Sequence, residues 1–137
     1  MNKAERIEFV ISEFRKADIT IDENQADKFV RLCDFMVEYN ENVNLTSITE
    51  FSEVVVKHFV DSVLPFTMVD VPQGSSFIDV GTGAGFPAIP LLICRPDLKG
   101  TLCDSLNKRC VYLEKACELI GVKSEIIHAR SEELGRK

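Results

Sequence analysis

Residues 77–87, Phe-Ile-Asp-Val-Gly-Thr-Gly-Ala-Gly-Phe-Pro, join a short apolar run to three glycines at alternate positions. The run is typical of a buried β-strand, and the first turn of a helix tolerates a proline such as Pro87. Glycine is favoured where the backbone must turn tightly or approach a ligand without a Cβ atom in the way. Free N–H groups at the start of a following helix favour a polar or anionic ligand. The stretch therefore predicts a strand, a ligand-binding loop and a helix in succession.

The spacing of the glycines separates the classes of nucleotide-binding loop. Dinucleotide-binding folds use Gly-x-Gly-x-x-Gly, whose third glycine would fall at position 86, and that residue is Phe86. No Gly-Lys-Ser/Thr follows, which excludes the phosphate-binding P-loop. Here Gly81, Gly83 and Gly85 follow Asp79. Gly-x-Gly-x-Gly after an aspartate is the pattern with which methyltransferases hold the methionine end of S-adenosyl-L-methionine.

An acidic residue stands at the end of the next predicted strand. Asp104 follows the apolar run 101–103 and lies 23 residues after Gly81. In cofactor-binding α/β folds, an acid about 20 residues beyond the glycine loop hydrogen-bonds ribose hydroxyls. The structural alternative is a tight turn at the glycines and a helix N-cap at Asp104. The strand, the helix and the placed acid together favour the cofactor site.

The first 70 residues are predicted to be wholly helical. They contain three apolar stripes at helical spacing, each typical of a helix that faces a core. Asp22 is the expected N-cap of the second helix, and the third is expected to end near Pro65. We expect residues 1–70 to form an N-terminal helical cap.

Residues 71–137 alternate short apolar runs with helical patterns. The runs at 77–80, 101–103 and 125–128 are predicted strands, and Asn107 to Ile120 is a predicted helix that Gly121 stops. This alternation predicts a parallel sheet with right-handed crossovers. We therefore expect an α/β, Rossmann-like class I methyltransferase fold, with residues 71–137 as the first half of the S-adenosylmethionine-binding domain.

The predicted sheet is truncated. Its first strand, 77–80, lies at one edge, whereas cofactor crevices form where the strand order reverses, so the strands that would pair on its other side are missing. We expect the chain to carry only the first part of an enzyme and to be poorly active by itself. The unpaired edge is the expected site of any self-association with a second copy.

Composition limits the compartment and the partners. The chain is 45% hydrophobic and 28% charged, as in soluble globular proteins, and its net charge of −6 neither supports nor excludes RNA. No apolar run approaches the roughly 20 residues of a membrane span, and the start does not resemble a signal peptide. The five cysteines form no Cys-x-x-Cys pair. We expect free buried thiols in the cytoplasm, no metal site and no membrane association.

Three ordered motifs resemble the glucose-inhibited division protein B family. They lie at 79–91, at 104–109 and, in the helical part, at 42–49 together with 57–62. The resemblance implies an S-adenosyl-L-methionine-dependent methyltransferase that acts on N7 of a guanine in small-subunit ribosomal RNA. Two positions depart from the family pattern: Ala88 replaces the usual glycine and Tyr39 a common tryptophan.

The resemblance also implies roles for individual residues. Gly81 and Phe86 would line the cofactor site, Asp104, Ser105 and Leu106 would hold the adenosine, and Ser131 and Glu132 would flank the adenine; Gly83 joins this set from the glycine pattern. By analogy, Asn44 and His58 are candidate substrate contacts. The alternative, purely structural role of Asn44 is to form a turn, and that of His58 is a half-buried side chain fixed by Asp61.

No catalytic residue is assigned from the sequence. N7 of guanine carries a lone pair and no proton, so methyl transfer requires alignment in a dry pocket rather than a general base. Two alternatives to RNA methylation remain. One is methylation of a protein or a small molecule on the same fold, and the other is a truncated, non-catalytic fragment.

Overall fold

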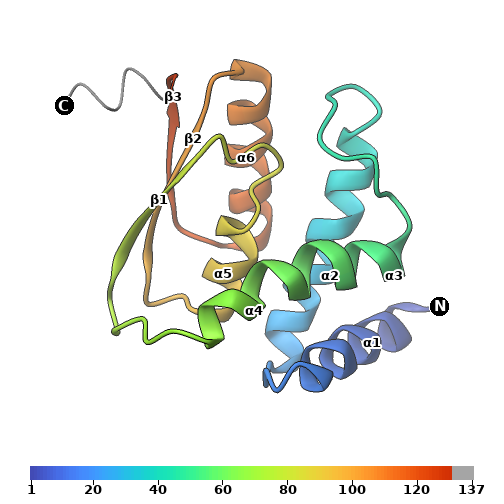
Figure 1. Ribbon diagram of the computed structural model, residues 1–137. Coiled ribbons are helices and arrows are strands. Elements are labelled where there is room, and N and C mark those ends of the chain that lie inside the picture. The colour runs from blue at the N-terminus through green and yellow to red at the C-terminus, as the bar shows by residue number, and fades with distance from the viewer. Residues whose placement is uncertain (131–137) are drawn as a thin grey trace.

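A computed structural model describes residues 1–130, and its elements confirm the predicted α/β fold (Figure 1). The helical part consists of α1 (Lys3–Lys16), α2 (Glu23–Tyr39), α3 (Phe51–Val54), a π-helical segment η1 (Val55–Val60) and α4 (Asp61–Thr67). The second part consists of β1 (Ser76–Val80), α5 (Ala88–Cys94), β2 (Lys99–Asp104), α6 (Asn107–Ile120) and β3 (Glu125–His128). The prediction that residue 70 divides two domains stays a prediction.

The three strands form a parallel sheet in the order β1-β2-β3. In its register Ile78 pairs with Thr101, and Thr101 pairs with Glu125. Because the strand order runs in one direction, both right-handed crossovers place their helices on the same side of the sheet. Figure 1 shows α5 and α6 together on that side. The carboxyl ends of all three strands meet at one edge of the sheet, where ligands of such folds bind.

Local capping signals set the helix ends. The Asp22 carboxylate accepts a hydrogen bond from the backbone N–H of Gln25 at 2.7 Å, and Oε1 of Gln25 accepts one from the backbone N–H of Asp22 at 2.8 Å. This reciprocal capping box confirms Asp22 as the N-cap of α2. Gly121 takes the left-handed conformation that ends α6, as predicted.

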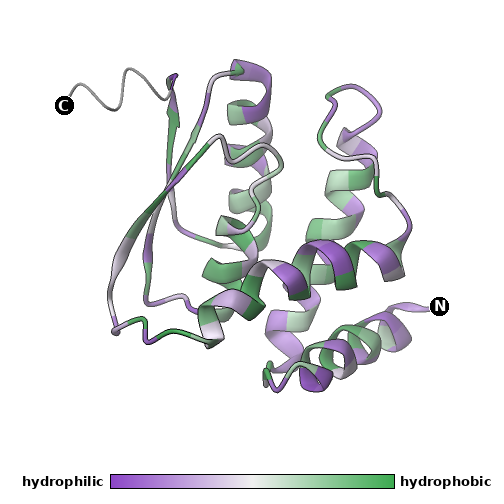
Figure 2. Ribbon diagram, in the orientation of Figure 1, coloured by the Kyte–Doolittle hydropathy of each residue, from purple (hydrophilic) through white to green (hydrophobic). Residues whose placement is uncertain are grey.

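One hydrophobic core joins the helical part to the sheet. In Figure 2 the ribbon of α5 is hydrophobic around its whole circumference, and six of its seven residues are buried. A chain of aromatic rings runs from α1 through α2 and η1 to the glycine loop. Its centroid distances are 4.9 Å for Phe14–Phe29, 4.9 Å for Phe29–Phe59 and 6.0 Å for Phe59–Phe86. Packed rings of this kind fix the loop against the helical cap.

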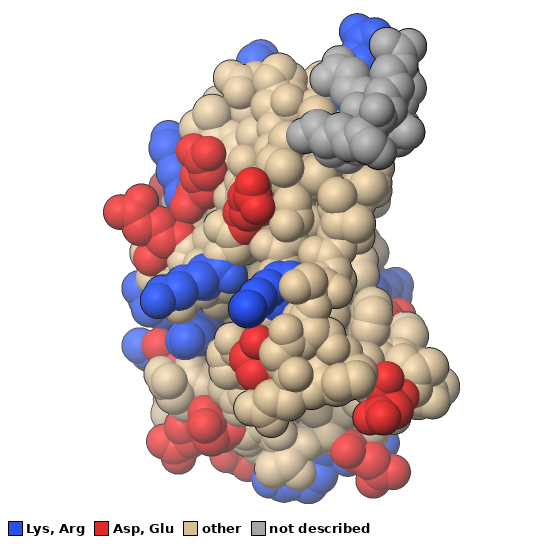
Figure 3. Space-filling model, turned by 90° about the vertical axis from the view of Figure 1, so that its left-hand side faces the viewer, with Lys and Arg blue, Asp and Glu red and all other residues tan. Residues whose placement is uncertain are grey.

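The opposite face of the sheet is open. Side chains alternate along a strand, so β1 directs Phe77 toward the helices and Ile78 and Val80 away from them. Ile78 is 55% and Val80 47% exposed. Figure 3 looks onto the molecule from this side, where uncharged surface adjoins a group of Lys and Arg side chains. The arrangement confirms a truncated sheet with β1 at its edge, and self-association through that edge stays a prediction.

The third predicted helix contains a π-helical turn that its apolar spacing did not predict. It ends at Thr67, near Pro65 as predicted, with Pro65 inside α4. The preceding turn, η1, is π-helical, and single π turns within α-helices occur frequently at functional sites. The hydroxyl of Ser62 donates to the carbonyl oxygen of His58, one of the groups in this turn. Apolar periodicity cannot reveal such a change of register, because the buried positions shift by only one residue.

Residues 1–130 contain no helix long and apolar enough to cross a membrane. Within the same residues, no group of three or more His, Cys, Asp or Glu side chains is placed to hold a metal ion. None of the five cysteines, which all lie within residues 1–130, forms a disulfide, and four are buried; Cys94 is only partly buried, whereas burial was predicted for all five.

Candidate functional site

The glycine loop lies over the carboxyl ends of β1 and β2. The backbone N–H groups of Gly81 and Thr82 donate to the carbonyl oxygen of Cys103 at 2.9 and 3.0 Å. Gly85 then donates to the carbonyl oxygen of Thr82 at 3.0 Å, which closes a tight turn. The loop that the sequence assigns to a cofactor is therefore held at the edge of the sheet where cofactors bind.

Two of the glycines meet different constraints. Gly85 has a φ of 90°, and a Cβ atom there would lie 2.5 Å from Cδ1 of Ile89, so both conformation and space require glycine. Gly81 has a φ of 70°, but a Cβ atom there would meet no atom within 4 Å. Gly85 is thus needed for packing, whereas the space above Gly81 is open to a ligand.

Asp104 holds the loop from below. Its carboxylate is 3% exposed. One oxygen accepts from the N–H of Gly83 at 2.9 Å, and the other accepts from the N–H of Leu106 at 3.0 Å. Nη1 of Arg109 lies 3.7 Å away. Asp104 is not the N-cap of α6, because Leu106 occupies that position. The acid predicted to bind ribose is thus also a clamp on the glycine loop.

Ser105 and Leu106 continue from Asp104 at the same edge. The carbonyl oxygen of Ser105 accepts a hydrogen bond from Nε2 of His128 at 2.9 Å. The Leu106 side chain is 50% exposed, which leaves an apolar surface beside the loop. Ser131 and Glu132, the other predicted contacts, lie outside the described residues.

Asp79 anchors the start of the loop. Its half-buried carboxylate accepts a hydrogen bond from the Thr82 hydroxyl at 2.8 Å, and the backbone N–H of Ala88 also interacts with it. Burial raises the pKa of this carboxyl, and the two hydrogen bonds partly oppose that rise. Asp79 therefore anchors the loop through a side-chain hydroxyl as well as through the backbone.

His58 contacts the glycine loop directly. Its ring stacks on Phe86 with centroids 4.6 Å apart and an interplanar angle of 17°. Nε2 lies 2.8 Å from Oγ1 of Thr46, so the hydrogen-bond partner is Thr46 rather than the predicted Asp61. Burial lowers the pKa of His58, and the charge of Asp61 partly opposes that effect. The imidazole is therefore neutral near pH 7.

A groove of about 510 Å³ opens beside this stacked pair. It is lined by Lys57, His58, Asp61, Ser62, Pro65, Phe66, Phe86 and Pro87. The groove offers aromatic walls together with one amine, one carboxylate and one hydroxyl. Asn44 does not line it; this exposed residue lies on the same loop as Thr46. The structure thus brings His58 and Phe86 together, whereas Asn44 is not part of the groove lining.

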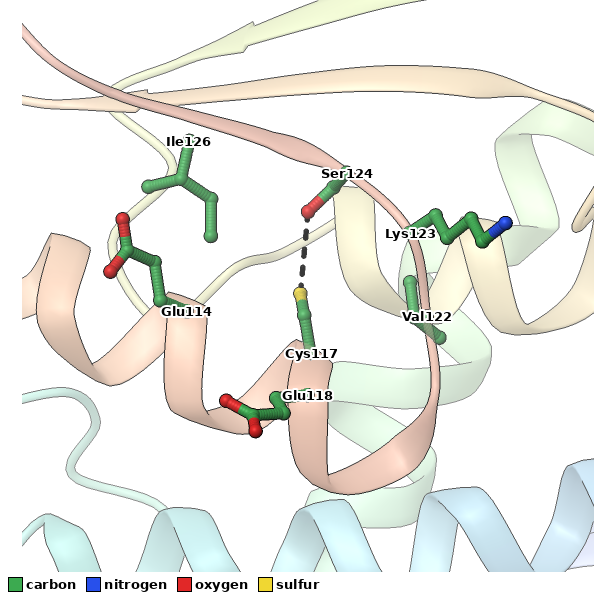
Figure 4. A pocket seen from close by; sticks show the side chains of 7 residues that line it. All are labelled: Glu114, Cys117, Glu118, Val122, Lys123, Ser124 and Ile126. Atoms are coloured by element: carbon green, nitrogen blue, oxygen red, sulfur yellow. Dashed lines mark hydrogen bonds between the residues drawn. The ribbon is translucent and has the colours of Figure 1, made fainter.

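A second cavity lies at the opposite edge of the sheet. Figure 4 shows its lining, in which Sγ of Cys117 lies 3.4 Å from Oγ of Ser124. It measures about 330 Å³ and adjoins the amino end of β3. Ligands of parallel α/β sheets bind at the carboxyl ends of the strands, so this cavity is not the candidate site.

Comparison with known proteins decides the family. The profile of the family described as rRNA small subunit methyltransferase G, GidB, matches residues 25–137. The chain belongs to this family. The match contains the glycine loop, Asp104 and His58, and it confirms the resemblance drawn from the three motifs.

Individual relatives carry the same name, ribosomal RNA small subunit methyltransferase G. The protein from Bacillus subtilis strain 168 is 42% identical over 132 residues, which cover 96% of this chain and 55% of the relative. The protein from Alkaliphilus metalliredigens is 45% identical over 118 residues, with 85% and 49% covered. The protein from Desulforamulus reducens is 40% identical over 124 residues, with 90% and 52% covered. The chain therefore spans about half the length of the curated relatives it matches.

The sequence did not identify Thr46 and Thr82 as residues of the candidate site. Thr46 contacts a ring 12 residues away, and Thr82 contacts Asp79 across the first turn of the loop. Both lie inside motifs that the sequence singled out. A hydroxyl within such a motif is the one signal that could have identified them.

Proposed function

We propose that the chain forms the amino-terminal, S-adenosyl-L-methionine-binding half of an enzyme that methylates N7 of a guanine in small-subunit ribosomal RNA. The observation that carries this proposal is the clamp between Gly83 and Asp104, which fixes a methyltransferase-type glycine loop at the carboxyl edge of the sheet. Membership of the rRNA small subunit methyltransferase G family supports the RNA substrate. A ribosomal substrate would place the enzyme in the cytoplasm.

The loop supplies the polar half of the proposed cofactor site. The open space over Gly81 and Gly83 lets a ligand reach the backbone. Asp104 uses one lone pair of each oxygen for a backbone N–H, and a carboxylate has about four acceptor positions. We assign a remaining position to a ribose hydroxyl. The exposed side chain of Leu106 supplies an apolar surface for the adenine ring.

The groove beside Phe86 is the proposed entrance for the base. Enzymes that modify a base take it out of the stack and hold it by stacking and by hydrogen bonds to its edges. Phe66 and Phe86 offer apolar surface for the ring, and His58 stands at the wall. Asn44, on the neighbouring loop, is a candidate contact with the surrounding RNA.

The proposed chemistry requires alignment rather than proton transfer. A bound S-adenosyl-L-methionine supplies a methyl group on a sulfonium, and N7 of guanine is a lone-pair nucleophile without a proton. The residues of this chain would orient the two reactants and exclude water from the space between them. The aromatic contacts of Phe86 with His58 and Phe59 give the loop the rigidity that such alignment needs.

Calorimetric titration of residues 1–137 with S-adenosyl-L-methionine tests the proposal. We expect saturable binding that Gly81→Ala weakens roughly tenfold or more, the equivalent of about 1.4 kcal/mol. Gly74→Ala is the matched control: Gly74 has a φ of 77° and Gly81 one of 70°, and neither has an atom near a new Cβ. Both variants carry similar strain, but only Gly81 lies in the proposed site. Absence of binding by the folded chain, or equal affinities of the two variants, would contradict the proposal.

A further inference from the structure

Thr46 is fixed more firmly than its position in a loop suggests. Asn40 binds the segment with both ends of its side-chain amide. Its oxygen accepts from the N–H groups of Leu45 and Thr46 at 2.8 and 3.0 Å, and its nitrogen donates to the carbonyl oxygen of Thr46 at 2.9 Å. The Thr46 hydroxyl is therefore held in one place relative to η1.

The hydrogen bonds of that hydroxyl determine where its proton points. Oγ1 of Thr46 accepts from the N–H of Ile48 at 3.0 Å and lies 2.8 Å from Nε2 of His58. Among residues 1–130, Nε2 is the one hydrogen-bond partner of this hydroxyl that could accept its proton, because the other partner, the N–H of Ile48, only donates. A neutral imidazole that accepts at Nε2 carries its hydrogen on Nδ1.

We propose that Thr46 is a positioning residue: it holds His58 as the Nδ1–H tautomer, stacked on Phe86, so that the groove presents one N–H donor to an acceptor atom of the bound base. The role toward a base rests on the proposed function, whereas the tautomer does not. Guanine offers O6 and N7 as neighbouring acceptors on one edge, and both suit a single N–H donor.

Two features of His58 support this assignment. Half-burial lowers its pKa, so the ring is neutral and has one donor and one acceptor nitrogen at pH 7. Within residues 1–130, Nδ1 has no hydrogen-bond partner of its own, and the ring lines the groove. An unpartnered N–H at a groove wall is the group that a ligand would satisfy.

His128 provides an internal reference in the same molecule. The sequence has two histidines. Nε2 of His128 faces the carbonyl oxygen of Ser105 at 2.9 Å, and a carbonyl only accepts, so His128 carries its hydrogen on Nε2. The two rings are therefore predicted to be opposite tautomers.

Nitrogen NMR of the 137-residue chain tests the inference at neutral pH. Two-bond couplings from the ring protons identify the protonated nitrogen of each histidine. We expect Nδ1–H for His58 and Nε2–H for His128. Thr46→Val should convert His58 to Nε2–H, the form that free imidazole side chains prefer, whereas Thr46→Ser should keep Nδ1–H. An Nε2–H signal for His58 in the unaltered chain, or no change in Thr46→Val, would overturn the inference.

A second arm tests the role toward the base. Saturating guanosine monophosphate should shift the Nδ1 resonance of His58 in the unaltered chain and in Thr46→Ser, but not in Thr46→Val. An unshifted Nδ1 would overturn the donor role. An unchanged, well-dispersed amide spectrum shows that each variant remains folded. Because the tautomer is read without cofactor or RNA, its failure is distinguishable from a failure of cofactor binding by calorimetry.

Discussion

Asp104→Ala would remove the clamp beneath the glycine loop and leave two backbone donors without their acceptor. The N–H groups of Gly83 and Leu106 lie 2.9 and 3.0 Å from its oxygens, and the side chain is 3% exposed. A hydrogen bond to a charged group contributes about 1.5–3 kcal/mol, so two give about 3–6 kcal/mol. Arg109, at 3.7 Å and partly exposed, adds little. Domains are stable by only about 5–15 kcal/mol, so this loss would be large.

Urea unfolding followed by circular dichroism measures the effect, provided that the slopes of the transitions agree. Asp97→Ala is the matched control. Asp97 also accepts from a glycine N–H, that of Gly74 at 3.0 Å, and pairs with Arg95 at 2.9 Å. It lies nearer the surface, with 20% of its side chain exposed, so we expect a clearly smaller loss. A loss below about 1 kcal/mol for Asp104→Ala, or one no larger than for Asp97→Ala, would refute the clamp.

Three further outcomes follow from the packing and the charges. Gly85→Ala should cost about 1–2 kcal/mol for its left-handed conformation plus about 1–3 kcal/mol for overpacking, whereas Gly74→Ala should show only the first cost in urea unfolding. Tyr112→Phe should leave the free energy of unfolding unchanged or raise it by up to about 1 kcal/mol, because the buried hydroxyl has no hydrogen-bond partner among residues 1–130. A clear loss of stability in thermal unfolding would contradict this. Burial lowers the pKa of His58 below 6.5, so as the pH falls the unfolded chain protonates His58 before the folded chain does. The free energy of unfolding should therefore fall as the pH drops below 6.5. If His58→Phe showed the same dependence of this free energy on pH, His58 would not be its cause.

Features determined by neighbouring residues were predictable from the sequence. Asp22 and Gly121 mark helix ends through their own chemistry, and both lie where predicted. The third strand and the helix from Asn107 to Ile120 have their predicted bounds, because their apolar patterns end in clear turn signals. The glycine loop was located by its spacing alone. These features depend on contacts within a few residues.

Features determined by long-range packing were not predictable. The π-helical turn replaces a regular helix that apolar spacing indicated, and Thr46 rather than Asp61 binds His58. Asp104 was expected to face a ligand, yet its oxygens also bind the loop 21 residues earlier in the chain. Such partners become neighbours only when the chain folds back on itself, within the helical part for Thr46 and His58 and within the α/β part for Gly83 and Asp104. The roles of Ser131 and Glu132 stay predictions.

Amide NMR of the chain titrated with S-adenosyl-L-methionine tests the central claim most directly, because it locates the cofactor rather than merely detecting it. We predict that the largest saturable shifts occur at the backbone N–H groups of Gly81, Gly83 and Leu106, at the carboxyl edge of the sheet. Shifts concentrated instead at Lys123 and Ser124, around the cavity of Figure 4, would contradict the proposed site. So would the absence of saturable shifts anywhere in a folded chain.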